Sequence, residues 1–303
     1  MRVVCLSGGV GGSKLARGLH DVLSPGELTV IGNVGDDIEV LGVHVSPDLD
    51  SVLYALAGVN DDERGWGRAG ETWRTLDSVR AWGGDGWFRL GDLDIGLHLV
   101  RTAALRDGER LSVVTARLVA AAGLASRILP ATDDRLRTSV VTPAGTFPFQ
   151  EWFVVRGHDD EVDAMVFDGA DAAVPADGVV EAIEDADLVV IAPSNPYTSI
   201  HPILAVDPIR RALAARHVRV VAVSPLIGGR AVKGPLDRML MRMSGGTSPA
   251  HVARCYEGLI GALVIDRADA PAETDIPLVV TDTLMTDRDA GRRLAEVVLE
   301  AVA

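Results

Sequence analysis

The amino-acid sequence contains several short segments whose residue types could bind a charged ligand, and the first is the glycine-rich Ser7–Lys14, SGGVGGSK. Glycine lets the backbone approach a ligand closely, and the start of a helix favours a bound anion. The segment is not a Walker A loop, because Ser13 precedes Lys14 where Gly-Lys-Ser/Thr is required. It is not a complete dinucleotide fingerprint either, because Lys14 stands where the third glycine would fall. We predict that the segment contacts a phosphate or nucleotide rather than serving only as a packing turn.

Acidic residues follow the next predicted strand. Asp36 and Asp37 come directly after it, and Asp48 and Asp50 lie a short distance further on. Asp48 could instead cap a helix, and Asp37 could be solvated. Carboxylate clusters suit Mg²⁺, which takes one or two protein carboxylates together with substrate phosphates and water. We expect at least one of Asp36, Asp48 and Asp50 to bind a metal or the substrate.

A third segment begins with Arg89 and continues into a predicted helix with Asp92 as its N-cap. Asp94, His98 and Arg101 fall on one face of this helix at i, i+4 and i+7. Taken alone, they predict a solvated face with a salt bridge, opposite an apolar stripe of Leu93, Leu97, Val100 and Ala104. Arg89 could contact a phosphate or a ring.

Polar loops also follow several later predicted strands. Pro193–Ile200 combines Ser, Asn and Thr with two prolines, which predicts either a rigid ligand-binding loop or a capped turn into a helix. Ser224–Gly229, Lys233–Pro235 and Asp282–Thr286 occupy comparable places. Because the carboxyl ends of parallel strands share one edge of a sheet, we expect these loops to gather there.

The elements that must position these segments follow an alternating strand and helix pattern. Near-continuous apolar runs indicate strands covered on both faces. They are Val3–Leu6, Leu28–Ile31, Leu188–Ala192, Val218–Val223, Ala262–Ile265 and Leu278–Thr281. Amphipathic stretches between them predict a doubly wound, mostly parallel, Rossmann-like α/β sheet.

The middle of the sequence differs from this pattern. Residues 60–130 look mostly helical, and hairpin-like strands follow at Thr138–Thr142, Phe147–Val155 and Val162–Phe167. We therefore assign residues 1–59 and 186–303 to a nucleotide-binding core. Residues 60–185 are assigned to a smaller α+β insertion that contributes to the acceptor site.

Composition excludes several classes of function. The 303 residues include 29 basic and 43 acidic residues, and a net charge of −14 argues against binding nucleic acid or anionic membranes. Two cysteines provide no disulfide framework, and the first apolar stretch is too short for a signal peptide. We expect a cytoplasmic protein.

Twelve motifs, in order from residue 7 to residue 287, resemble one known family. They are SGGVGGSKL, GDD, SPDLDSVLY, RGWG, ETW, LGDLD, LPATDD, FQEWFV, APSNPYTSI, SPLIGG, VKGP and DTLMTD. The sequence resembles the 2-phospho-L-lactate transferases of coenzyme F-420 biosynthesis, including their phosphoenolpyruvate transferase branch. The resemblance implies a Mg²⁺-dependent homodimer that moves a phospho-lactyl, phospho-enolpyruvyl or similar group. The donor is guanosine diphosphate-activated, the acceptor is the ribityl hydroxyl of the deazaflavin Fo, and GMP is released.

The resemblance also assigns roles to individual residues. Asp50 and Arg89 are expected to contact Fo, Asp36 and Asp50 to be catalytic, and Asp36 and Asp48 to bind the metal. Contacts to the donor are expected from Gly8, Gly9, Gly11, Gly12, Ser13, Lys14, Ser194, Asn195, Thr198 and Ser199.

The sequence departs from the family pattern at two positions. Leu93 replaces a common basic residue, and His201 replaces a glycine. Two alternatives remain from other classes, a nucleotide-sugar-binding regulatory protein and a nicotinamide-dependent dehydrogenase.

Overall fold

The computed structural model describes residues 1–301 and confirms the α/β class, with a parallel sheet whose strand order is β14-β13-β10-β9-β1-β2-β5. Residues 302 and 303, the end of the expected core segment, lie outside the described part. The strands are β1 (Val3–Ser7), β2 (Leu28–Gly32), β5 (Arg127–Pro130), β9 (Leu188–Ile191), β10 (Val220–Val223), β13 (Ala262–Asp266) and β14 (Leu278–Thr281).

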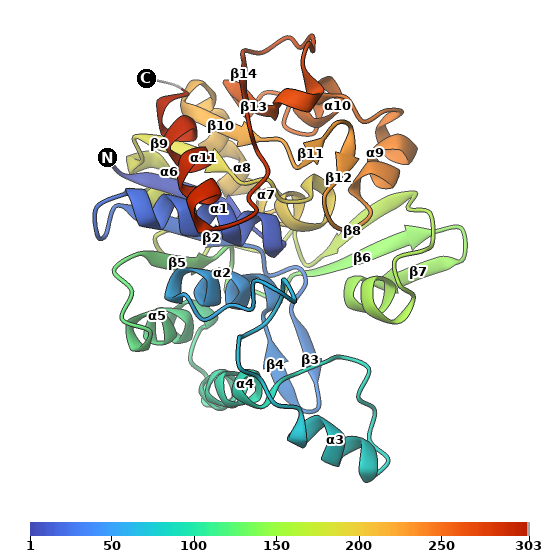
Figure 1. Ribbon diagram of the computed structural model, residues 1–303. Coiled ribbons are helices and arrows are strands. Elements are labelled where there is room, and N and C mark those ends of the chain that lie inside the picture. Colours follow the sequence, from blue (N-terminus) through green and yellow to red (C-terminus); the bar gives the residue numbers. More distant parts are fainter. Residues whose placement is uncertain (302–303) are drawn as a thin grey trace.

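Helices cover both faces of this sheet, which explains why its strands are continuously apolar. On one face α1 (Gly9–Val22) packs against α2 (Pro47–Ala57) and α11 (Arg288–Glu300) (Figure 1). On the other face α6 (Val179–Asp185) packs against α8 (Asp207–Ala214). No helix within residues 1–301 has both the length and the apolar character to cross a membrane.

The connections from β1 and β9 leave in opposite directions. The chain runs from β1 through α1 to β2 on one side. From β9 it runs through α7 (His201–Leu204) and α8 to β10 on the other side. Because β1 and β9 are paired neighbours, the sheet has a topological switch point between them. Open α/β sheets bind ligands outside the carboxyl ends of strands at such a point.

Two smaller units project from the core (Figure 1). One contains the β3–β4 hairpin with α3 and α4, and α5 lies beside β5. The other is an antiparallel sheet in the order β7-β6-β8. Their bounds are β3 (Ile38–Val40), β4 (Val43–Val45), α3 (Arg74–Ala81), α4 (Asp92–Arg106), α5 (Leu111–Ala121), β6 (Arg137–Thr142), β7 (Gly145–Pro148) and β8 (Ala164–Asp168). Although β5 falls within residues 60–185, it pairs with β2 in the main sheet.

Three expected strands differ from the structure at their ends. The strand expected from Val162 begins at Ala164. The strand expected over Phe147–Val155 ends at Pro148, and Glu151–Val155 forms a π-helical turn that places Trp152 in the core. The strand expected from Val218 begins at Val220, because a 3₁₀ turn occupies His217–Arg219. The remaining elements are η2 (Pro196–Ile200), β11 (Leu226–Ile227), β12 (Arg230–Ala231), α9 (Leu236–Ser244), α10 (Pro249–Arg254) and η4 (Arg267–Asp269).

Candidate active site

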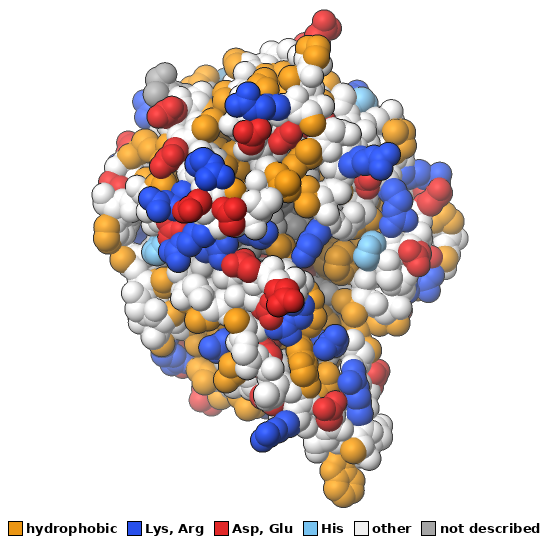
Figure 2. Space-filling model, viewed as in Figure 1, with side chains coloured by type: hydrophobic (Ala, Val, Ile, Leu, Met, Phe, Trp, Pro, Cys, Tyr) orange, Lys and Arg blue, Asp and Glu red, His pale blue; other side chains and the backbone are white. Residues whose placement is uncertain are grey.

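A cleft of about 710 Å³ opens at the switch point, at the carboxyl ends of β1 and β9. The core supplies one wall and the projecting unit around α3 and α4 supplies the other, and Figure 2 shows the surface hollowed near the middle of this face. The cleft brings together the segments after β1, β2, β9, β10 and β14. The clustering expected for the polar loops is therefore present in the fold.

The glycine segment forms the first turn of α1 rather than a separate loop, because the helix begins at Gly9. The Gly9 amide donates to Asp48 Oδ1 at 2.6 Å. Ser194 Oγ accepts from the Gly8 amide at 3.2 Å and donates to the Gly8 carbonyl at 2.7 Å. These bonds join the segment after β1 to α2 and to the segment after β9. A helix start leaves amide groups without intrahelical partners, which can bind an anion.

Not every residue expected at the donor site reaches the cleft. Gly8, Gly9, Gly11 and Lys14 line it. Gly12 does not, and a Cβ there would collide with Ser194 Oγ, so this glycine serves close packing.

Ser13 also lies off the cleft. Its hydroxyl donates to the Val10 carbonyl at 3.0 Å, within the first turn of α1. Lys14 Nζ donates to the Met285 carbonyl at 2.9 Å, and both residues line the cleft.

The segment after β9 is both a capped turn and part of the cleft wall. Asn195 Oδ1 caps η2 by accepting from the amides of Tyr197 at 3.0 Å and Thr198 at 3.4 Å. The cleft is lined here by Ser194, Asn195, Thr198 and Ser199. All four residues expected on this segment therefore lie at the cleft.

Asp36 and Asp48 are two buried carboxylates that line the same cleft. Asp48 accepts from Asn33 Nδ2 at 2.9 Å in addition to Gly9. It lies in the first turn of α2 and does not cap that helix, because the N-cap is Ser46. Burial raises the pKa of Asp36 well above its ordinary value, and the negative charge of Asp48 raises it further. Burial likewise raises the pKa of Asp48. This pair favours a nearby positive charge.

Asp37, in contrast, is directed away from the cleft. Its Oδ2 accepts from Ser46 Oγ at 2.9 Å and lies 3.0 Å from His44 Nε2. The residue is buried rather than solvated, and it fastens the β3–β4 hairpin to the start of α2.

The carboxylates of the cleft suit Mg²⁺ better than a metal ion that is coordinated entirely by protein side chains. Among residues 1–301 there is no cluster of three or more His, Cys, Asp or Glu side chains arranged for a metal ion. Asp36 Oδ1, however, is buried and has no hydrogen-bond partner in the described chain. Mg²⁺ is commonly held by one or two carboxylates with phosphate and water completing its shell. Asp36 and Asp48 could supply those carboxylates.

The polar face of α4 points inward, and the expectation of a solvated face was wrong. Arg101 is only 1% exposed and forms two hydrogen bonds with Asp50, one of them 3.0 Å long from Nη1 to Oδ2. Arg101 Nη1 also lies 3.3 Å from His98 Nδ1, and burial lowers the pKa of His98 to about 4, so a neutral imidazole can accept there. The need to neutralise buried Asp50 overrides the local apolar pattern and leaves Leu93 and Val100 exposed.

The N-terminus of α4 also differs from expectation, because Gly91 rather than Asp92 is the N-cap. Asp92 instead accepts from the amides of Arg74 at 3.1 Å and Thr75 at 2.9 Å, at the start of α3. Glu71 accepts from the first amides of α4 in turn. Asp92 in α4 and Glu71 just before α3 therefore satisfy unpaired amides at the starts of the two helices.

Asp50 lines the cleft from α2 of the core. Arg89 lines it from the insertion wall. Its guanidinium lies 4.5 Å from the ring centroid of Trp73 and 5.7 Å from that of Trp66. Trp66 lines the cleft, whereas Trp73 borders a smaller hollow of 340 Å³ behind it. Other aromatic rings on the cleft wall are Tyr54, Trp87, Phe88, Phe149 and Phe153.

Site reasoning from the sequence missed Gln150 and gave Lys233 no role. Gln150 lines the cleft and donates to the Asp36 carbonyl at 3.2 Å. The motif FQEWFV contains it, but an expected strand there gave no reason to place its side chain in a site. Lys233 projects from the segment between β12 and α9 and also lines the cleft.

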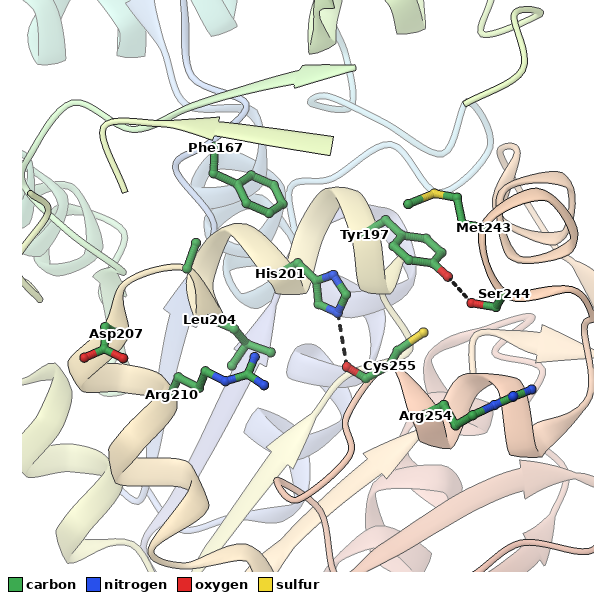
Figure 3. Close-up of a pocket in the computed structure, with 11 residues that line it drawn as sticks. Phe167, Tyr197, His201, Leu204, Asp207, Arg210, Met243, Ser244, Arg254 and Cys255 are labelled. Carbon is green, nitrogen blue, oxygen red and sulfur yellow. Dashed lines mark hydrogen bonds between the residues drawn. The ribbon is translucent and has the colours of Figure 1, made fainter. Parts of the chain in front are cut away.

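A second hollow lies behind η2 and contains His201 (Figure 3). His201 Nε2 lies 3.1 Å from the Cys255 carbonyl, and Tyr197 forms a 2.6 Å hydrogen bond with Ser244. These contacts fasten η2 and α7 to the α9–α10 region. His201 therefore has a structural contact outside the cleft.

Comparisons with known proteins show what this chain is similar to. The family model described as 2-phospho-L-lactate transferase CofD matches residues 3–291. The phosphoenolpyruvate transferase of Streptomyces griseus subsp. griseus is 42% identical, with 99% of this chain and 98% of that protein covered. The phosphoenolpyruvate transferase of Thermobifida fusca is also 42% identical, with 96% of each chain covered.

A solved structure shares the fold at lower identity. A member of the UPF0052 family from Bacillus halodurans is 17% identical, with a TM-score of 0.63 over 98% of both chains. At that identity the likeness concerns the fold alone. The family model and the curated relatives, in contrast, cover nearly the whole sequence. The chain therefore belongs to the 2-phospho-L-lactate transferase CofD family.

Proposed function

We propose that this transferase moves a phosphorylated three-carbon acid from a guanosine diphosphate-activated donor to the ribityl hydroxyl of the deazaflavin Fo, with release of GMP, in coenzyme F-420 biosynthesis. The observation that carries the proposal is a single cleft with two unlike walls. One wall offers a glycine-rich helix start and buried carboxylates, and the other offers aromatic rings. The names of the curated relatives support transfer of an enolpyruvyl-containing group.

The core wall supplies what a nucleoside diphosphate requires. The first turn of α1 presents backbone amides, and Lys14 adds a positive charge beside it. The capped turn at Asn195 provides a rigid neighbour for the nucleoside, because its backbone is already held by side-chain hydrogen bonds. These groups act chiefly by positioning and neutralising the donor, which is most of what phosphoryl-type transfer needs.

We propose Mg²⁺ as the cofactor, held by Asp36 and Asp48. When bound, the ion would neutralise diphosphate charge and make the distal phosphorus more electrophilic. The unpartnered Asp36 Oδ1 and the raised pKa values of both carboxylates support this assignment.

The insertion wall suits the acceptor. Trp66, Trp87 and Phe88 offer surfaces for a flat ring, and Arg89 lies beside them. In the proposed reaction the ribityl oxygen bonds to the distal phosphorus as the bond to the bridging oxygen breaks. GMP leaves with that oxygen and the electron pair. The hydroxyl proton passes to Asp36 or Asp50, and Asp50 is held in place for orientation by Arg101.

The proposal is tested by incubating the purified protein with Fo and each of three donors, carrying lactate, enolpyruvate or glycerate. We expect GMP and a phosphodiester product, identified by mass, with at least one donor. Excess chelator should abolish turnover, and added Mg²⁺ should restore it. Tight nucleotide binding with no GMP release would instead support a regulatory nucleotide-binding protein and would refute the proposal.

A further inference from the structure

Both lysines of this chain line the cleft, although lysine is rare in the sequence. Of 29 lysine and arginine residues, only Lys14 and Lys233 are lysines. Lysine carries a compact charge on a flexible stem, whereas arginine has a planar fork suited to fixed, bidentate pairs. Both ammonium groups are therefore concentrated at the place where an anionic donor would bind.

The two lysines differ in what holds them. Lys14 Nζ donates to the Met285 carbonyl at 2.9 Å. Lys233 is exposed, and within residues 1–301 it has neither a hydrogen-bond partner nor an ion-pair partner. Its ammonium reaches across the cleft to Gly65, on the insertion wall, where a Cβ would collide with Nζ. Gly65 has a φ of +76°, so a larger residue there would be strained as well as obstructive.

The other basic side chains at or beneath the cleft are either paired with another group or uncharged. The Arg89 guanidinium stacks on Trp73, and His98 is neutral because burial lowers its pKa to about 4. Arg101 is buried and forms an ion pair with Asp50. A donor phosphate can use α1 amides and Lys14, but a carboxylate further along the donor would find only Lys233 without a partner.

We propose that Lys233 binds the carboxylate of the three-carbon acid carried by the donor. The inference rests on the proposed transferase function and deepens it by naming the residue that recognises the transferred group. The position of Lys233 between the core wall and Gly65 places that carboxylate between donor phosphates and the aromatic acceptor wall. Lys233 would therefore orient the distal phosphorus toward the acceptor.

The first experiment compares Lys233→Met with Lys233→Arg, using lactyl-diphosphoguanosine and its carboxamide analogue as donors. A charge-assisted hydrogen bond predicts that Lys233→Met lowers kcat/KM for the carboxylate donor about 10- to 100-fold. The carboxamide donor should lose little further activity, because its missing charge already removes the same interaction. Lys233→Arg should recover part of the loss. Arg230→Met is the matched control, because Arg230 is exposed on the same segment and does not line the cleft.

The outcomes separate this inference from the proposed function. If the unmodified protein uses no donor, the proposed function fails. If it is active and Lys233→Met loses equally on both donors, Lys233 does not recognise the carboxylate. Unchanged kinetics would overturn the inference as well. Because Lys233 is exposed, its replacement should leave the unfolding temperature unchanged, which a thermal melt verifies.

A second measurement uses the scarcity of lysine. An amine-acylating reagent can modify only Lys14, Lys233 and the N-terminus, and peptide masses report each site. We expect the complete donor to protect Lys233 and GDP to leave it reactive. Equal protection by GDP would show that Lys233 contacts a phosphate, and it would overturn the assignment to the carboxylate.

Discussion

Replacement of Arg101 by methionine tests whether α4 is held by a buried ion pair. Arg101 and Asp50 are 1% and 5% exposed, and they share two hydrogen bonds. Methionine fills similar space but leaves the Asp50 carboxylate buried without its counter-charge. Arg101→Met therefore keeps most of the packing and removes the electrostatic partner.

The expected cost is large for one substitution. Removal of one partner from a buried pair destabilises a protein by about 3–5 kcal/mol. For a chain of this size, each kcal/mol lowers Tm by about 1.5–2 °C, so Arg101→Met should lower Tm by roughly 5–10 °C. The double variant Asp50→Asn, Arg101→Met should lose less, because no uncompensated charge remains.

Thermal and urea unfolding of the unaltered protein, Arg101→Met, the double variant and a control variant give these differences. Arg106→Met is the control, because Arg106 is exposed on the same helix and would lose only an exposed hydrogen bond to the Gly42 carbonyl, which should matter by at most about 1 kcal/mol. A loss below about 1 kcal/mol for Arg101→Met, or a double variant less stable than Arg101→Met, would refute the charge argument.

Three further predictions concern the cleft and its support. Gly8→Ala should lower both stability and turnover, because the added Cβ would lie 2.5 Å from Asp48 Oδ2. Gly96→Ala is the control, because its Cβ would meet no atom within 4 Å, and thermal melts should show it to be neutral or stabilising. Burial, together with the charge of Glu71, raises the pKa of Asp94 from 3.8 to about 6 and so disfavours its charged form. Asp94→Asn should therefore stabilise the protein above pH 6 but not below pH 3.8. Equal urea midpoints for the variant and the unaltered protein at pH 8 would contradict this. Arg89→Gln should raise KM for Fo several-fold more than KM for the donor in steady-state kinetics, and equal changes would remove Arg89 from the acceptor side.

Much of the fold could be predicted from local pattern. The strands at Val3, Leu28, Leu188, Ala262 and Leu278 were recognisable because helices cover both faces of the sheet, which makes the runs continuously apolar. The sequence also predicted that the glycine turn, the Asp36–Asp48 region and the turn at Ser194 would lie together, and all three line the cleft. The reason is that segments following parallel strands lie at the carboxyl edge of the sheet.

The helix α4 shows where local pattern fails. Its sequence separates polar Asp94, His98 and Arg101 from apolar Leu93 and Val100, which predicts burial of the apolar side. The structure buries these polar residues and exposes Leu93 and Val100, while Ala104 of the same apolar stripe stays buried. Asp50, the partner of Arg101, lies on α2. The sequence of α4 alone therefore cannot show that Arg101 must be buried to neutralise it.

The sequence by itself therefore determined the alternating sheet and most of the segments that line the cleft, because both depend on the spacing of residues along the chain. Only the tertiary structure decided that Arg101 supports Asp50, that Gly12 and Ser13 pack away from the cleft, and that Lys233 crosses it toward Gly65. Those relations depend on distances between segments far apart in sequence, and such distances exist only after the insertion has packed against the core.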